Sequence, residues 1–190
     1  MRPEQIKARE YLHQKGTLLA PTVVHERVRA AFLATEEFLD GIAETEARCR
    51  PAPGEWSVQE IADHLVETHR PSLHELQSLL RGERPSGGPI PASLQSPAPL
   101  ERRWSQLVEG LKRLHAEVLA LLANVPDDFV SKARAPAVLV VNAKSPDGSE
   151  GPLHWVEELD WKAYAVVFRL HEVDHLGQAK RALKAVRGEA

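Results

Sequence analysis

The chain has 190 residues, which is enough for one well-buried core and too few for two separate domains of ordinary size. Apolar residues make up 43% of it, charged residues 27%, and the formal net charge is -3, as in an ordinary soluble globular protein. This balance argues against a protein that binds nucleic acid through a basic face, so we expect no nucleic acid among its partners.

The sequence also lacks the usual signals of a membrane or secreted protein. No apolar run approaches the roughly 20 residues that a membrane-spanning helix needs. The N-terminal sequence has no apolar core like that of a signal peptide. The single cysteine, Cys49, allows no internal disulfide and fits a reducing compartment. We therefore expect a cytoplasmic protein with no membrane contact.

Four long segments carry helical periodicity, and the breaks between them are rich in proline and glycine. The first of the four runs from about Thr22 to Ala47. A shorter helix, from about Pro3 to Lys15, precedes it and is expected to be closed by Gly16. We therefore divide the chain into an N-terminal extension, residues 1–21, and one bundle domain, residues 22–190.

The start of the second helix is the best-defined boundary in the sequence. Ser57 is followed three residues later by Glu60, and this spacing is the signature of a capping box at a helix N-terminus. An apolar stripe then continues to Leu80. The next segment, Arg84–Pro99, holds five prolines and three serines, so it is predicted to be a surface connection.

The third helix, Leu100–Leu121, has apolar residues at regular heptad spacing. Such a short heptad run usually forms a seam within one chain, although a homodimer is the alternative. The fourth helix spans about Glu158–Val186. Between these helices, the β-branched run Ala137–Val141 and the turn sequence Pro146–Ser149 predict a small hairpin or extended excursion. The predicted fold class is therefore all-α, a four-helix bundle with a helical extension.

His171 and His175 are the most informative residues of the chain. They stand four positions apart on the fourth helix, so their directions differ by only about 40°. The apolar residues around them turn this face toward the bundle interior. Two neutral imidazoles buried side by side would need two sets of hydrogen-bond partners, whereas one divalent ion satisfies both. The pair therefore predicts two-thirds of a metal site.

A third ligand is expected, because metal sites with an open position usually keep three protein ligands. The run from His171 to His175 also matches the H-E-x-x-H pattern of zinc metalloproteases, in which Glu172 would be the general base. This alternative is weaker, because only fifteen residues follow His175 to supply the downstream ligand. Upstream, His64 stands among the apolar positions of the second helix and is the preferred third ligand, with His69 in reserve.

The acidic residues and the remaining histidines are not expected to take part in catalysis. Glu172 and Asp174 point about 100° away from the two histidines, so both are expected to form a solvated acidic edge. Glu60 is already explained by the capping box. Lone histidines such as His115 and His154 are expected to be structural or exposed. The sequence therefore names no catalytic acid or base.

Two stretches resemble the DinB superfamily, which includes YfiT-like metal-dependent hydrolases and bacterial thiol transferases. Residues 56–65 are similar to the family's Trp-Ser-x-x-Glu-x-x-x-His-Leu entry into the second helix. Residues 171–178 are similar to its His-x-x-x-His-x-x-Gln motif, which ends here at Gln178. With four helices in the expected order, the resemblance covers about residues 22–186.

This resemblance implies a DinB/YfiT-type bundle that holds a zinc or nickel ion with His64, His171 and His175. Such a site suits two reactions on a small-molecule substrate. In one, a low-molecular-weight thiol such as bacillithiol or mycothiol is activated for S-transfer, and in the other a water molecule is activated for hydrolysis. The alternative from another class is a non-enzymatic, metal-stabilised bundle that dimerises or binds a ligand.

Overall fold

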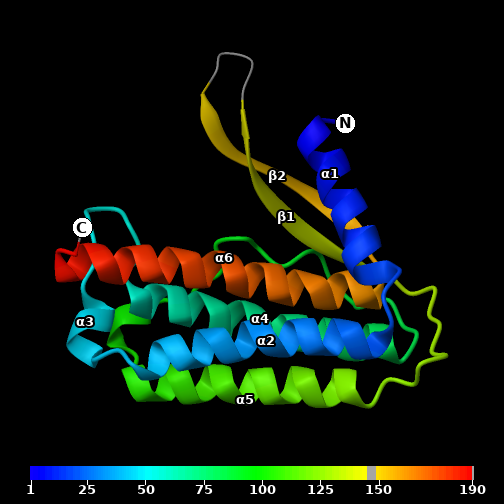
Figure 1. Cartoon of the computed structure of the whole chain (residues 1–190), viewed down its shortest axis with the longest axis horizontal. Coiled ribbons are helices and arrows are strands. Elements are labelled where there is room, and N and C mark those ends of the chain that lie inside the picture. The colour runs from blue at the N-terminus through cyan, green and yellow to red at the C-terminus, as the bar shows by residue number, and fades with distance from the viewer. Residues whose placement is uncertain (145–148, 190) are drawn as a thin grey trace.

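Four long helices form the body of the molecule and lie side by side (Figure 1). They are α2 (Pro21–Asp40), α4 (Val58–Leu80), α5 (Trp104–Ala123) and α6 (Trp161–Arg187). This computed structural model describes residues 1–144 and 149–189. It confirms the predicted four-helix bundle. Within those residues, no helix combines the length and apolar character needed to cross a bilayer.

The shorter elements connect and extend the bundle. Helix α1 (Pro3–Leu12) continues into a π-helical turn, η1 (His13–Thr17). A short helix, α3 (Glu44–Arg48), precedes α4, and a single 3-10 turn, η2 (Pro99–Glu101), precedes α5. Two antiparallel strands, β1 (Ala135–Lys144) and β2 (Glu150–Leu159), lie between α5 and α6.

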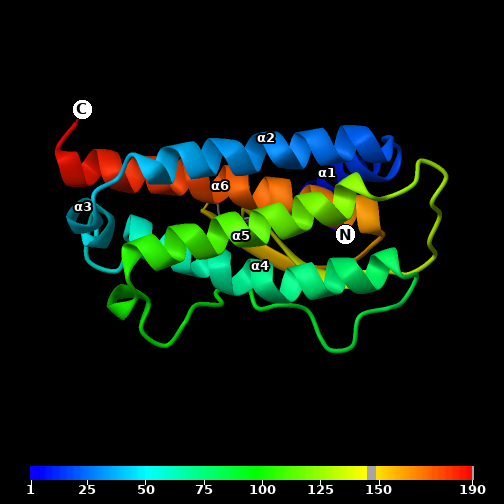
Figure 2. The ribbon, with the colours of Figure 1, turned by 90° about the horizontal axis from the view of Figure 1, so that it is seen from below.

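The directions of the helices explain the length of one connection. Helix α2 packs against α5 and α6, and α4 packs against the same two helices. Helices α2 and α6 run in one direction, whereas α4 and α5 run in the other (Figures 1 and 2). Because α4 and α5 are consecutive, adjacent and parallel, residues 81–103 must return along the bundle between them. This return segment passes beside the functional site described below.

The apolar heptad of the third predicted helix lies inside the bundle. Leu107, Leu111 and Val118 of α5 are buried against the neighbouring helices. Burial of each of these large apolar side chains contributes roughly 1.5–3 kcal/mol to the stability of the folded state. The seam predicted within one chain is therefore confirmed.

The first bundle helix ends earlier than predicted. Helix α2 stops at Asp40, and the chain turns before the separate helix α3 begins. The Ile42 side chain is buried in this turn, and its carbonyl accepts a hydrogen bond of 3.1 Å from the indole of Trp104. Tertiary contacts with α5 therefore override the helical periodicity that predicted one helix through Ala47.

Gly16 also has a different role from the predicted helix stop. It lies inside η1, where a Cβ atom would come within 2.9 Å of the Cα atom of Ala163. A side chain at this position would collide with the backbone of α6. Glycine therefore allows the N-terminal segment to lie directly against the start of α6.

The predicted hairpin is confirmed, with Val138 opposite Val156 in its register. Residues alternate along β1, so that Ala137 and Leu139 are buried and Val140 is exposed. The hairpin projects from the bundle next to α1 (Figure 1). Residues 146–148 of the predicted turn Pro146–Ser149 lie outside the described part of the chain.

Candidate metal centre

The N-terminus of α4 is capped as the sequence predicts. The Ser57 hydroxyl accepts a hydrogen bond of 3.2 Å from the backbone N–H of Glu60, and the Glu60 carboxylate accepts one of 2.9 Å from the backbone N–H of Ser57. This reciprocal pair satisfies two otherwise unpaired donors of the first turn. It fixes the start of α4. Two turns later His64 points into the bundle, where it is fully buried.

Helix α6 carries the other two predicted ligands. The Asp160 side chain caps this helix by accepting hydrogen bonds of 3.0 Å from the backbone N–H groups of its first turn. His171 and His175 then occupy one face of α6, and the structure brings them together with His64. One ring nitrogen from each of the three histidines lies within 4.8 Å of the other two. We call His64, His171 and His175 the three-histidine cluster.

Two of these rings are held in one tautomer by neighbouring acceptors. The Nδ1–H group of His64 donates to the Leu94 carbonyl at 2.7 Å, because that oxygen can only accept. The Nδ1–H group of His175 donates to Oε1 of Gln178 at 2.9 Å. In both rings Nε2 therefore carries the lone pair, and that of His64 lies 2.9 Å from Nε2 of His171. A bond from Nδ1 to a neighbouring acceptor is the usual support of metal-ligating histidines. Gln178, whose role the sequence leaves open, thus orients His175.

Burial keeps the three imidazoles neutral. It lowers the pKa of His64 to about 4 and that of His171 well below its ordinary value, and the neighbouring imidazoles add to both effects. Burial also lowers the pKa of His175, although the hydrogen bond to Gln178 partly opposes it. Near neutral pH all three rings therefore present uncharged nitrogen donors, the form that binds metal ions.

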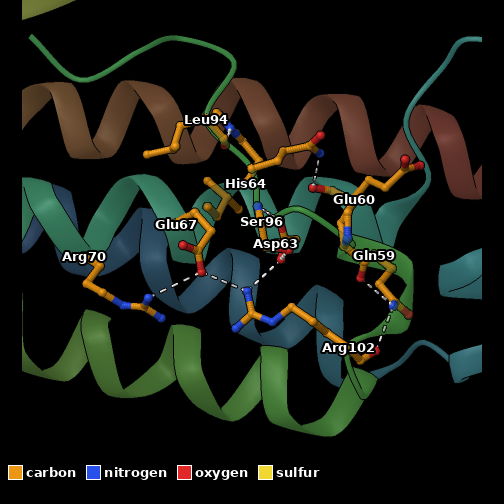
Figure 3. A network of polar contacts seen from close by, with 12 residues as sticks. Gln59, Glu60, Asp63, His64, Glu67, Arg70, Leu94, Ser96 and Arg102 are labelled. Carbon is orange, nitrogen blue, oxygen red and sulfur yellow. Dashed lines mark hydrogen bonds and ion pairs between the residues drawn. The ribbon is translucent and has the colours of Figure 1, made fainter.

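The return segment between α4 and α5 supports His64 (Figure 3). The Asp63 carboxylate accepts hydrogen bonds of 2.8 Å from both the backbone N–H and the hydroxyl of Ser96. It also accepts one of 2.6 Å from Arg102, which bridges Asp63 to Glu67. These bonds fix the segment on α4 and so hold the Leu94 carbonyl against His64. The proline-rich stretch predicted to be only a surface connection is therefore part of the site.

A pocket of about 640 Å³ opens beside the three-histidine cluster. Helices α4 and α6, the strand β1, helix α1 and the return segment all contribute to its walls. All three histidines of the cluster line it. Its lining also includes Tyr11, Thr68, Ser72, Glu75, Ile90, Pro136, Leu139, Val141, His154, Tyr164, Phe168 and Asp174.

The carboxyl group of Glu75, a residue of α4, lies in the wall of this pocket. The Tyr164 hydroxyl donates a hydrogen bond to Glu75, and both side chains are buried. Burial raises the pKa of Glu75, although the bond from Tyr164 partly opposes this effect. The pair provides a polar contact in an otherwise largely apolar wall.

Comparison with known proteins agrees with this architecture. The family model of the DinB superfamily matches residues 26–179. The chain belongs to the DinB superfamily. Among solved structures, YfiT from Bacillus subtilis matches with a TM-score of 0.64 and 17% sequence identity, over 90% of this chain and 89% of YfiT. YfiT is described as a probable metal-dependent hydrolase with an unusual four-helix bundle topology. No match to this chain is found among curated proteins.

The reserve ligand His69 lies outside the three-histidine cluster of this DinB protein. It is buried one helical turn farther along α4, together with His115 of α5 and Glu172 of α6. Ligand atoms of these three residues also lie within 4.8 Å of one another. We call His69, His115 and Glu172 the inner cluster.

The prediction for one member of the inner cluster, Glu172, was wrong. Glu172 was expected on a solvated acidic edge, but its side chain is fully buried and its Oε1 atom lies 3.1 Å from Nε2 of His115. His115, which was expected to be structural or exposed, is also buried and stacks on Phe32 with 3.9 Å between ring centroids. The reason is that α6 packs against both α2 and α4, so residues about 100° apart on it both face the interior.

The position of Glu172 also bears on the protease alternative. Glu172 does not line the pocket that the three-histidine cluster faces, whereas the exposed Asp174 does. A general base must come within hydrogen-bond reach of the reacting group, directly or through one water molecule. The Glu172 carboxylate instead lies against His69 and His115, so it is not placed to act as the general base of a metalloprotease.

Proposed function

We propose that this DinB protein is a metal-dependent enzyme that acts on a small molecule, by hydrolysis or by thiol S-transfer. The ion would be held by His64, His171 and His175. The observation that carries the proposal is that this cluster faces a pocket. Structural metal sites are usually closed by four protein ligands, whereas catalytic sites keep an open position.

The residues present fit a divalent transition metal ion. Three neutral imidazoles converge, and the Nδ1 bonds to Leu94 and Gln178 leave the lone pairs of two of them on Nε2. Imidazole donors suit zinc and nickel, which are the ions we propose. When bound, such an ion supplies Lewis acidity, which favours the deprotonated form of a coordinated water or thiol near neutral pH.

The pocket supports a small-molecule substrate. Its volume of about 640 Å³ lies within the range of roughly 300–1,000 Å³ that is typical of ligand pockets. The apolar residues of β1 and α6 exclude water from the bound molecule. The hydroxyl groups of Thr68 and Ser72 and the Glu75 carboxyl group provide the polar contacts that would orient it.

Hydrolysis and S-transfer share this site and differ in the bound nucleophile. The likeness in fold to YfiT, described as a probable metal-dependent hydrolase, supports the first reaction. A thiol such as bacillithiol or mycothiol is the cosubstrate that we propose for the second. Both reactions use the apolar pocket to bind the electrophilic substrate.

Metal content and activity can be measured on the same preparations. The wild-type protein, expressed with zinc and with nickel, would be analysed for bound metal. It would then be assayed with ester, amide and electrophilic substrates, with and without each thiol. We expect turnover in one of the two series, loss of that turnover after chelation and its return when the ion is restored.

The variant His175→Ala should lose the ion of the three-histidine cluster and, with it, turnover. His74→Ala is the matched control, because His74 is an exposed histidine of α4 outside the pocket lining. Metal content equal to wild type in His175→Ala would overturn the proposed ligand set. A protein that loses thermal stability on chelation but turns over no substrate in either series would instead be a metal-stabilised binding module.

A further inference from the structure

The inner cluster brings three donors from three different helices to one point. Nε2 of His115 lies 3.1 Å from Oε1 of Glu172, and Nε2 of His69 lies 3.4 Å from the same oxygen. Ligand atoms around a tetrahedral ion with bonds of about 2.0–2.2 Å stand roughly 3.3–3.6 Å apart. The spacing of the inner donors is therefore close to that of a metal coordination sphere.

Polar atoms of this cluster lack partners. Among the described residues, neither ring nitrogen of His69 has a hydrogen-bond partner, although the side chain is only 1% exposed. The Oε2 atom of Glu172 is also buried without one. Each unsatisfied buried polar atom costs roughly 1–3 kcal/mol, so such groups normally have a partner. The inner cluster thus has the donors for an occupant at its centre.

The third donor is oriented from outside the cluster. Nδ1 of His115 lies 2.8 Å from Oε1 of Glu36, a residue of α2. A carboxylate on the far nitrogen of a histidine is a common support of metal ligands, because it fixes the ring and increases the basicity of the other nitrogen. Glu36 therefore directs Nε2 of His115 toward Glu172 and His69.

We propose that His69, His115 and Glu172 form a second metal site, which binds a divalent transition metal ion inside the bundle. Two imidazoles and one carboxylate suit zinc, iron(II) or manganese better than magnesium or calcium, which prefer oxygen donors. The ion takes the place of the proton between His115 and Glu172. Its binding therefore releases that proton to solvent.

The helices that build the three-histidine cluster also build this second site. His64 and His69 are five residues apart on α4, which turns their directions apart by about 140°. His171 and Glu172 are adjacent on α6. The rings of His69 and His171 lie 5.8 Å apart, and both line the pocket. His69 therefore stands between the pocket and the other two residues of the inner cluster.

The test is a titration of the metal-free protein with zinc ions alone. We expect the wild type to bind two equivalents, with a proton released on filling the inner site. His64→Ala and His115→Gln should each bind one equivalent. His64 belongs only to the three-histidine cluster and His115 only to the inner cluster, so each change removes a ligand from one site. Wild-type crystals soaked in zinc should show two anomalous peaks, one in each cluster.

One equivalent in the wild type, lost in His64→Ala and unchanged in His115→Gln, would overturn the second site. The inner cluster would then be a buried ion pair of His115 and Glu172. If His115→Gln does not fold, the wild-type crystal decides the question, because an anomalous peak among the inner donors needs no variant. The absence of that peak at saturating zinc would equally overturn the proposal.

Discussion

The three-histidine cluster and the inner cluster both use side chains of α4 and α6, to which the inner cluster adds His115 of α5, yet their surroundings differ. In the first, His64 and His175 each donate to a neutral acceptor, and the rings face a pocket. In the second, a buried carboxylate lies between two histidines and α2 and α5 close the site. The same two helices can therefore contribute to a cluster that faces a pocket and to one that is buried, because each helix has more than one interior face in a bundle.

The largest loss of activity is expected when His64, a proposed ligand, is changed to alanine. We expect His64→Ala to reduce kcat/KM by more than about 100-fold, because loss of even a supporting partner of a ligand costs about 10–100-fold. Steady-state kinetics of the zinc-loaded protein would measure this loss. The same change at the exposed His74 should leave kcat/KM within twofold of wild type, and an equal loss in both variants would contradict the comparison.

The inner cluster should contribute more to the stability of the metal-free protein. In His115→Ala, Glu172 loses its hydrogen-bond donor in the interior and Phe32 loses its stacked ring. We expect the free energy of unfolding to fall by about 3–5 kcal/mol. The partly exposed His175 loses one hydrogen bond when changed to alanine, so about 1 kcal/mol is expected there. Urea denaturation would compare the two, and similar losses would mean that the clusters do not differ in this respect.

A smaller effect is expected from the residue that orients His175. Gln178→Ala removes the acceptor for Nδ1 of His175 while it keeps all three ligands. Affinity for zinc should fall by about 10–100-fold, which a competition titration with a chromogenic chelator would measure. The exposed Gln106 of α5 provides the control. Unchanged affinity in Gln178→Ala would show that ring orientation is set by packing alone.

In the metal-free protein, a histidine of each cluster should change the folding stability with pH in opposite directions. Burial lowers the pKa of His64 to about 4. In the unfolded chain this imidazole is protonated as the pH falls below about 6.5, whereas in the folded chain it stays neutral until about pH 4. His64 therefore reduces stability as the pH falls from 6.5 to about 4, by about 1.4 kcal/mol per pH unit.

His115 should show the reverse. Burial alone would lower its pKa, but the bonds to Glu172 and Glu36 outweigh burial and raise it. Its contribution to stability is then complete below the unfolded pKa and is lost as the pH rises through the raised folded pKa. Imidazole chemical shifts followed from pH 4 to 8 would separate the two residues. Both rings titrating at the same pH would refute the distinction.

The part of the site that could be predicted depends on spacing within single helices. His171 and His175 are four residues apart, so any α-helix places them on one face. His64 follows a clear helix start, and the apolar residues around it indicate the interior side of α4. By contrast, Leu94 acts through its backbone carbonyl, which no side-chain pattern reveals.

The same argument accounts for the error at Glu172. Its direction, about 100° from His171, was correctly derived from helix geometry. The assumption that this direction leads to solvent was wrong, because α6 packs against both α2 and α4 and this direction also faces the interior. His69 and His115 are isolated in the sequence, and only the packing of α4 against α5 and α6 brings them to Glu172.

The amino-acid sequence by itself determined the four helices, the hairpin, the start of α4 and the place of His171 and His175 on one face of α6. These features depend on local periodicity and on capping, which act within a few residues along the chain. Only the tertiary structure decided that the return segment supports His64, that Gly16 packs against Ala163, and that an inner cluster exists. Those contacts join residues that are distant in sequence, and they form only when the faces of separate helices are packed together.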